Sequence, residues 1–243
     1  MDQLFEELDK KLFIIRTKNW TKCEFNGTGC TGMQLEKLLG KNLDNYLLPD
    51  LNGIEIKTKC LSKNIEKYGL SLFSSAFDDY PNSNQDFFNK VCIYDSNCNQ
   101  YKFQRRINTL KGIVVRNFYI KIITDDKLKK IKLIIINRKN HNVESIHSWN
   151  YSELEARLTK KLKYMVLVYA KLYTINNIKY VKYLDYHFYK LKPFQSFLYC
   201  INKGYITINF NIIKKKTIID KGTSFEININ KIEELFDEIK KDN

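Results

Sequence analysis

The residues Ile54-Glu55-Ile56-Lys57-Thr58 alternate strictly between apolar and polar side chains. This period of two predicts a β-strand that buries its isoleucines and places Glu55 and Lys57 on the opposite face. The strand follows Pro49-Asp50 and a turn at Leu51-Asn52-Gly53, and the segment leading into the proline is expected to be extended. Any fold of this chain must therefore accommodate a half-buried strand that carries an acid and an amine side by side, with a second acid just before it.

The remaining patterns predict both helices and strands, with no internal repeat and no linker rich in proline or serine. Apolar residues spaced three and four apart predict helices over residues 2–15, 33–39, 152–161, 192–203 and 231–241. Apolar or alternating runs predict strands over residues 69–73, 112–123, 130–136, 162–173, 178–183 and 205–213, the first of them beside 54–58. The glycine-rich cluster at 26–32 predicts a loop. We expect an α/β protein with a mixed sheet.

The composition favours a folded protein with a polyanionic partner. The chain has 243 residues, 44% of them hydrophobic, and a formal net charge of +14. This length allows one large domain or two lobes, and the charge favours nucleic acid before a membrane surface. A chain rich in Lys, Asn and Ile is also what an AT-rich genome produces, so charge alone does not establish this partner. No apolar run reaches the roughly 18 residues of a membrane span, and no signal-peptide pattern is present, so we expect a cytoplasmic protein.

The cysteines and histidines do not form a metal-binding pattern. No cysteine pair has the CxxC spacing, and no histidine lies at zinc-finger spacing. We expect the cysteines to be reduced and the histidines to be packing or surface residues. The residues concerned are Cys23, Cys30, Cys60, Cys92, Cys98, Cys200, His141, His147 and His187.

The acids around the strand suit phosphodiester hydrolysis. That reaction needs a divalent ion to activate water and to neutralise charge at the phosphate, and magnesium prefers oxygen ligands. Asp50, Glu55 and the carbonyl of Ile56 can converge on one ion, while Lys57 projects beside Glu55 and can orient the attacking water. Glu36, in the preceding helix, can hold the ion's water or Lys57. The alternative is a solvated strand face with a cross-strand ion pair, and these residues alone leave it open.

Longer motifs resemble a known family of nucleases. The run Gly27-Thr28-Gly29-Cys30-Thr31-Gly32 is followed by Leu35-Glu36-Lys37-Leu38-Leu39-Gly40, Pro49-Asp50 and Gly53-Ile54-Glu55-Ile56-Lys57-Thr58. Together they strongly resemble the MvaI/BcnI restriction endonucleases, relatives of MutH and Sau3AI within the PD-(D/E)XK nucleases. The resemblance is greatest to MvaI and is looser between Asp78 and Gly112. Further similar segments are Tyr68–Phe73, Trp149–Leu154, Lys160–Tyr164 and Gly222–Phe225.

The resemblance implies a PD-(D/E)XK core and a two-lobed monomer that closes around duplex DNA. Residues 1–173 would form the catalytic lobe and 174–243 the DNA-recognition lobe. Asp50 and Glu55 would bind Mg²⁺ with the Ile56 carbonyl, Lys57 would serve the water, and Glu36 would support them. A cognate DNA methyltransferase is implied genetically, without a stable complex. The residues expected to contact DNA are Thr28, Lys59, Asn211, Lys214, Lys215, Lys216, Lys221 and Glu226.

The C-terminal segment departs from the family where bases are read. Where MvaI has arginines, this chain has Asn211 and Glu226, and Lys221 replaces a histidine before Gly-Thr. Asparagine suits adenine, lysine reaches guanine and glutamate accepts from cytosine. We therefore expect a short specific site that differs from the GC-rich sites of the relatives.

The expected activity is that of a type II restriction endonuclease. A MutH-like strand-nicking repair enzyme and a non-catalytic DNA-binding protein with the same fold are the alternatives. The intact acids and lysine favour catalysis, and nothing in the sequence marks a surface for a repair partner. No RNP-like aromatic motif supports an RNA-binding protein.

Overall fold

The computed structural model describes residues 2–27, 29–41, 49–51, 53–61, 69–78, 82–214, 218–220 and 223–241. The chain forms two compact units, each built from segments distant in sequence. Unit 1 contains residues 1–68, 159–191 and 236–243, and unit 2 contains residues 69–158 and 192–235. The boundary predicted at 173/174 falls inside unit 1, and residues 69–158 belong with most of the C-terminal segment. Within the described residues, no helix is both long and apolar enough to cross a membrane.

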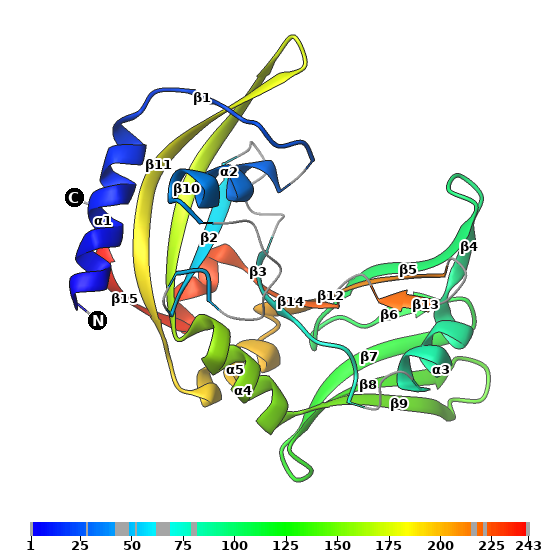
Figure 1. Cartoon of the computed structure of the whole chain (residues 1–243). Helices are drawn as coiled ribbons and strands as arrows, with labels where there is room; N and C mark the ends of the chain where they lie inside the picture. The colour runs from blue at the N-terminus through cyan, green and yellow to red at the C-terminus, as the bar shows by residue number, and fades with distance from the viewer. Residues whose placement is uncertain are drawn as a thin grey trace. The chain divides into compact units, whose positions relative to one another are not determined.

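Unit 1 is built on a five-stranded sheet with helices beside it (Figure 1). The strand order is β1-β11-β10-β2, and β15 also pairs with β11. The long β10–β11 hairpin turns at Asn176 and Asn177, which both have positive φ, as a type I′ turn requires. Strand β2 lies parallel to β10. The elements are α1 (Asp2–Thr17), β1 (Thr21–Lys22), α2 (Cys30–Leu38), β2 (Ile54–Cys60), the end of α4 (Tyr151–Leu162), β10 (Tyr164–Ile175), β11 (Ile178–Leu191) and β15 (Phe236–Lys241).

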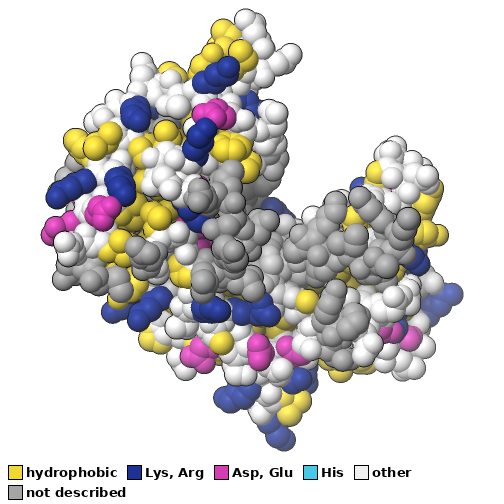
Figure 2. All heavy atoms as spheres, in the orientation of Figure 1, with side chains coloured by type: hydrophobic (Ala, Val, Ile, Leu, Met, Phe, Trp, Pro, Cys, Tyr) yellow, Lys and Arg dark blue, Asp and Glu magenta, His cyan; other side chains and the backbone are white. Residues whose placement is uncertain are grey.

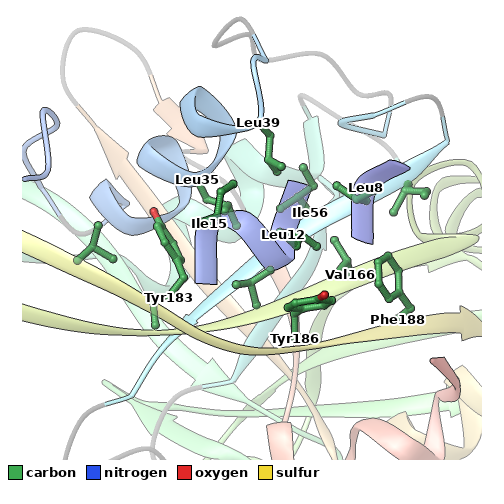
Figure 3. Packing of buried hydrophobic residues seen from close by; sticks show 14 residues of the cluster. Leu8, Leu12, Ile15, Leu35, Leu39, Ile56, Val166, Tyr183, Tyr186 and Phe188 are labelled. Atoms are coloured by element: carbon green, nitrogen blue, oxygen red, sulfur yellow. The ribbon is translucent and has the colours of Figure 1, made fainter. Parts of the chain in front are cut away.

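The core of unit 1 joins α1 and α2 to the sheet (Figure 3). Helix α1 contributes Leu8, Leu12 and Ile15, whose spacing places them on one helix face. Strand β2 contributes Ile54 and Ile56, which are both buried. This burial confirms the predicted strand and its buried isoleucines, and it leaves the acidic and basic side chains of β2 on the other face.

Unit 2 contains two antiparallel sheets. One has the order β3-β14-β12-β5-β4, with β13 also paired to β12, and the other has the order β6-β7-β8-β9. Helix α4 begins in this unit and ends in unit 1. The other elements are β3 (Leu70–Ser74), α3 (Asn82–Val91), β4 (Ile93–Asp95), β5 (Gln100–Ile107), β6 (Ile113–Val115), β7 (Phe118–Asp125), β8 (Lys130–Asn137), β9 (Val143–Asn150), α5 (Phe194–Asn202), β12 (Ile206–Lys214), β13 (Ile218–Asp220), β14 (Ser224–Ile227) and the 3₁₀ segment η2 (Ile229–Glu234).

An aromatic core holds unit 2 together. The ring of Trp149 on β9 lies 6.4 Å from Phe210 on β12 and 5.5 Å from Phe225 on β14, centroid to centroid. Phe87 on α3 stacks on Phe210 at 5.5 Å. One face of the sheet containing β12 is therefore apolar, and alternation along its strands places polar side chains on the opposite face.

Two predictions about the sheets are corrected by the structure. Residues 69–73 were expected beside 54–58, but β3 pairs with β14 in unit 2, and β2 pairs with β10. The apolar run 162–173 is that parallel neighbour, and its central residues are buried on both faces, as is usual for a parallel strand. Alternation reveals which face of a strand is buried, but it does not specify the partner strand.

The predicted helix over 231–241 is also wrong. The segment instead forms η2 and then β15, which pairs antiparallel with β11. Ile232, Leu235 and Phe236 are buried, and their spacing fits a helix as well as a 3₁₀ turn followed by a strand. The available edge of β11 decides between these patterns, because pairing there satisfies the backbone groups of both strands.

Candidate active site

Strand β2 places an acid and an amine in contact. Lys57 Nζ lies 2.8 Å from Glu55 Oε1. The Glu55 side chain is only 4% exposed, and its second oxygen, Oε2, is buried without a hydrogen-bond partner in the described part of the chain. A buried carboxylate oxygen without a partner is costly, which is a feature typical of sites that bind a cation or react.

A tight turn brings Asp50 to the same strand. Leu51 and Ile54 exchange two backbone hydrogen bonds of 3.0 and 2.8 Å, and Gly53 adopts a φ of +99°, which favours glycine. The chain reverses there, so that the Ile56 N–H donates to Asp50 Oδ2 at 2.9 Å. The described residues of this segment thus agree with the predicted turn, while Asn52 lies outside them.

Glu36 comes from α2, together with a lysine that the sequence did not point to. The helix ends in a Schellman motif, in which Gly40 has a φ of +80° and the Lys41 N–H donates to the Glu36 carbonyl at 2.9 Å. This motif returns Lys41 to the acids, where its Nζ lies 3.6 Å from Glu36 Oε2 and forms a hydrogen-bonded ion pair with Asp50. The predicted cap at Gly40 signals this return of the chain.

Burial and negative charge act together on Glu36. Its burial and the nearby Asp50 carboxylate raise the pKa of Glu36 above its ordinary value, and Lys41 partly opposes this shift. Glu55 contributes a smaller repulsion. The acids from α2, the turn and β2 therefore influence one another electrostatically, as a shared cation site requires.

A second lysine reaches the site from α4. Lys161 Nζ lies 3.5 Å from Glu55 Oε1, so this oxygen has two ammonium groups near it, those of Lys57 and Lys161. This lysine belongs to a segment that resembles MvaI, but its place beside Glu55 depends on α4 leading into β10 next to β2. The site thus unites Glu36, Asp50, Glu55 and Lys57 with two further lysines.

The donor set fits a hard divalent cation. Asp50, Glu55 and the Ile56 carbonyl offer oxygen ligands only, which suit magnesium, and Glu55 Oε2 lacks a partner among the described residues. Within the same residues, no cluster of three His, Cys, Asp or Glu side chains is arranged around a common point. The six cysteines are free.

The predicted DNA-contacting residues fall into three groups. Thr28, Lys215, Lys216 and Lys221 lie outside the described residues. Lys59 continues the Glu55 and Lys57 face of β2 but is only 7% exposed, and Lys214 is exposed at the end of β12. On the face shown in Figure 2, the coloured Lys and Arg side chains are scattered over the surface of each unit.

The third group, Asn211 and Glu226, takes part in a side-chain network of unit 2. Asn211 Oδ1 accepts a hydrogen bond from Gln104 Nε2 at 2.9 Å, and Glu226 Oε2 accepts one from Arg106 Nη2 at 2.9 Å. Gln104 and Arg106 lie on β5, in the stretch where the family resemblance was loosest. Sequence reasoning missed both because only the pairing of β5 with β12 brings them here.

The fold is that of a restriction endonuclease. The structure is similar to a solved complex of restriction endonuclease MvaI with its cognate DNA substrate, with a TM-score of 0.87, 24% sequence identity and 99% coverage of both chains. It is also similar to MvaI solved in the absence of DNA, with a TM-score of 0.60, 25% identity, and coverage of 98% of this chain and 97% of that one.

The family follows from the sequence as a whole. The family model described as the MvaI/BcnI restriction endonuclease family matches residues 9–236. The chain therefore belongs to the MvaI/BcnI restriction endonuclease family, which confirms the resemblance carried by the motifs at residues 27–32 and 53–58. A search among curated proteins found no match.

Proposed function

We propose that this protein is a type II restriction endonuclease that hydrolyses phosphodiester bonds of double-stranded DNA at a short specific site. It would act with Mg²⁺, in the cytoplasm, as a monomer that cuts one strand at a time. Unit 1 would carry the catalysis and unit 2 the sequence recognition. A DNA methyltransferase would protect the host DNA as a separate enzyme. Family membership supports the reaction class. The proposal is carried by two lysine–acid groups, Lys41 with Glu36 and Asp50 and Lys57 with Glu55, which the hydrogen bond from the Ile56 N–H to Asp50 links.

The residues of unit 1 have separate roles in this proposal. Asp50, Glu55 and the Ile56 carbonyl would hold the metal. Mg²⁺, when bound, activates water and neutralises charge at the scissile phosphate. Lys57 donates a hydrogen bond that orients the attacking water, and Glu55 fixes the position of its Nζ at 2.8 Å. Glu36 and Lys41 position Asp50 from the helix end.

The test is incubation of the purified protein with plasmid and phage DNA, with magnesium or with EDTA. Discrete fragments that appear only with magnesium are expected. Nicked circles alone would indicate a strand-nicking repair enzyme, and a mobility shift without cleavage would indicate a DNA-binding protein. Either of these results would overturn the proposal, as would cleavage in EDTA.

Variants of the site test the individual roles. We expect Asp50→Ala and Glu55→Ala to abolish cleavage while DNA binding survives. Lys57→Ala should lower the rate by about 10²-fold or more, and Lys57→Arg should restore little, because a guanidinium is planar and larger than an ammonium. Lys190→Ala, on an exposed position of β11, is the matched control and should cut at the wild-type rate. A fully active Glu55→Ala or Lys57→Ala variant would refute the assigned role.

A further inference from the structure

One sheet of unit 2 has a polar face built from three neighbouring strands. Register places Arg106 of β5 directly opposite Asn209 of β12, and Ser224 of β14 opposite Asn209 on the other side. Asn211 pairs with Gln104 in the same way. Directly opposed residues share a face, so these side chains lie together on the side away from the aromatic core. We call this set the polar sheet face, and it consists of Gln104, Arg106, Asn209, Asn211, Ser224 and Glu226.

An ion pair crosses this face. Arg106 Nη2 lies 2.9 Å from Glu226 Oε2, although β12 separates the strands β5 and β14 that carry the two residues. The Glu226 side chain is 10% exposed, while that of Arg106 is 42% exposed. The carboxylate is thus the buried anchor, and the guanidinium is its exposed partner.

Glu226 is itself held in one position. Its Oε1 accepts hydrogen bonds from Asn209 Nδ2 at 2.9 Å and from Ser224 Oγ at 3.2 Å. The Cβ atom of Glu226 packs closely against Gly69, because a Cβ atom added at Gly69 would lie only 2.8 Å from it. Both carboxylate oxygens are therefore engaged within the protein, and the anchor cannot swing toward another partner without breaking several contacts.

We propose that Arg106 is a specificity-determining residue that reads a guanine in the major groove, and that Glu226 is its positioning residue. The inference rests on the proposed function and adds the base-reading residue to it. An arginine pairs bidentately with the O6 and N7 atoms of guanine, and a guanidinium fixed by a carboxylate is already oriented for that planar contact. The exposed side of Arg106 is the side that DNA can reach.

This assignment changes the role expected of Glu226. From the sequence it was expected to accept a hydrogen bond from cytosine, but its oxygens bind Arg106, Asn209 and Ser224 instead. An arginine on β5 thereby supplies the guanine-reading group that the C-terminal segment lacks. An ordinary exposed ion pair would not need an acceptor this buried or this well supported.

The experiment compares cleavage profiles on a random-sequence DNA library. In Arg106→Gln we expect discrimination at a single G·C pair of the site to fall by about tenfold to a hundredfold. Glu226→Gln should relax discrimination at the same pair to a smaller extent, because the arginine remains but loses its charged anchor. Arg105→Gln is the matched control, since Arg105 is the adjacent exposed arginine on the opposite strand face, and its profile should equal the wild-type profile.

The outcomes separate this inference from the proposed function. Wild-type protein that cuts no DNA would defeat the proposed function, and selection of bound sequences from the same library would then test Arg106 by itself. An unchanged profile in Arg106→Gln, or a uniform loss over all sequences, would overturn the guanine-reading role, because a phosphate contact weakens all sites alike. Relaxation of the same pair by Arg105→Gln would overturn it as well. Thermal unfolding of each variant checks the fold, and Arg106→Lys provides a second, charged variant.

Discussion

Acidification should destabilise unit 2 through one buried histidine. His147, on β9, is only 2% exposed and packs between the rings of Phe77 and Phe87 at centroid distances of 4.9 and 5.5 Å. Its ring nitrogens lie 3.1 Å from the hydroxyls of Ser83 and Ser145. This environment accommodates the neutral ring and disfavours the charged one.

The size of the effect follows from the pKa. Burial lowers the pKa of His147 from 6.5 to about 4, with Asp86 opposing the shift and Lys90 adding to it. A histidine with a depressed pKa in the folded state contributes stability above its unfolded pKa and loses it as the pH falls toward the folded value. Between about pH 6.5 and about pH 4 the unfolded state binds one more proton at this histidine than the folded state does. The free energy of unfolding therefore falls by about 3 kcal/mol across this range.

The assay is denaturant unfolding of wild type and His147→Gln from about pH 7.5 to about pH 4.5. The chain has two tryptophans, and Trp149 is buried in the unit 2 core whereas Trp20 is exposed in unit 1. A Trp20→Phe background therefore makes fluorescence a probe of unit 2. The carboxylates titrate in both proteins, so their contribution cancels in the difference between the two free energies of unfolding. The pH dependence of that difference therefore reports His147 alone. A difference that stays constant across this range would refute the reasoning, because the histidine would then have the same pKa in both states.

Two further predictions concern stability around the two sites. Gly69→Ala should destabilise unit 2 by about 1–3 kcal/mol, because the added methyl group would collide with Glu226. Gly29→Ala is the control: its methyl group meets only an ordinary contact, so stability should change by less than about 1 kcal/mol. Equal effects of the two variants in calorimetry would contradict this prediction. Lys41→Met should lower the free energy of unfolding, measured with denaturant, by about 1–3 kcal/mol, because its partners Glu36 and Asp50 are largely buried acids. Lys37→Met breaks an exposed ion pair with Glu24 and should lower it by less than about 1 kcal/mol. The reverse order for the two lysines would show that the acids do not depend on Lys41.

Local sequence determined the chemistry of β2. The alternation of residues 54–58 specifies which side chains share a face, because successive residues of a strand point in opposite directions whatever its neighbours are. That Glu55 and Lys57 share one face follows from that period, and the structure places their charged groups in contact there. Gly40 likewise marks the end of α2, because its positive φ is readily adopted by glycine. These features depend on interactions between residues close in the chain.

Tertiary structure decided which strands pair and which side chains arrive from a distance. Residues 69–73 and 236–241 carry patterns that suit several partners or even a helix, and the pairing edges of β14 and β11 select one outcome. Arg106 and Lys161 reach their acids only through the pairing of β5 with β12 and of β2 with β10. Sequence periodicity records which face is buried, whereas the choice of partner depends on the fit of surfaces far apart in the chain, and no local pattern contains that information.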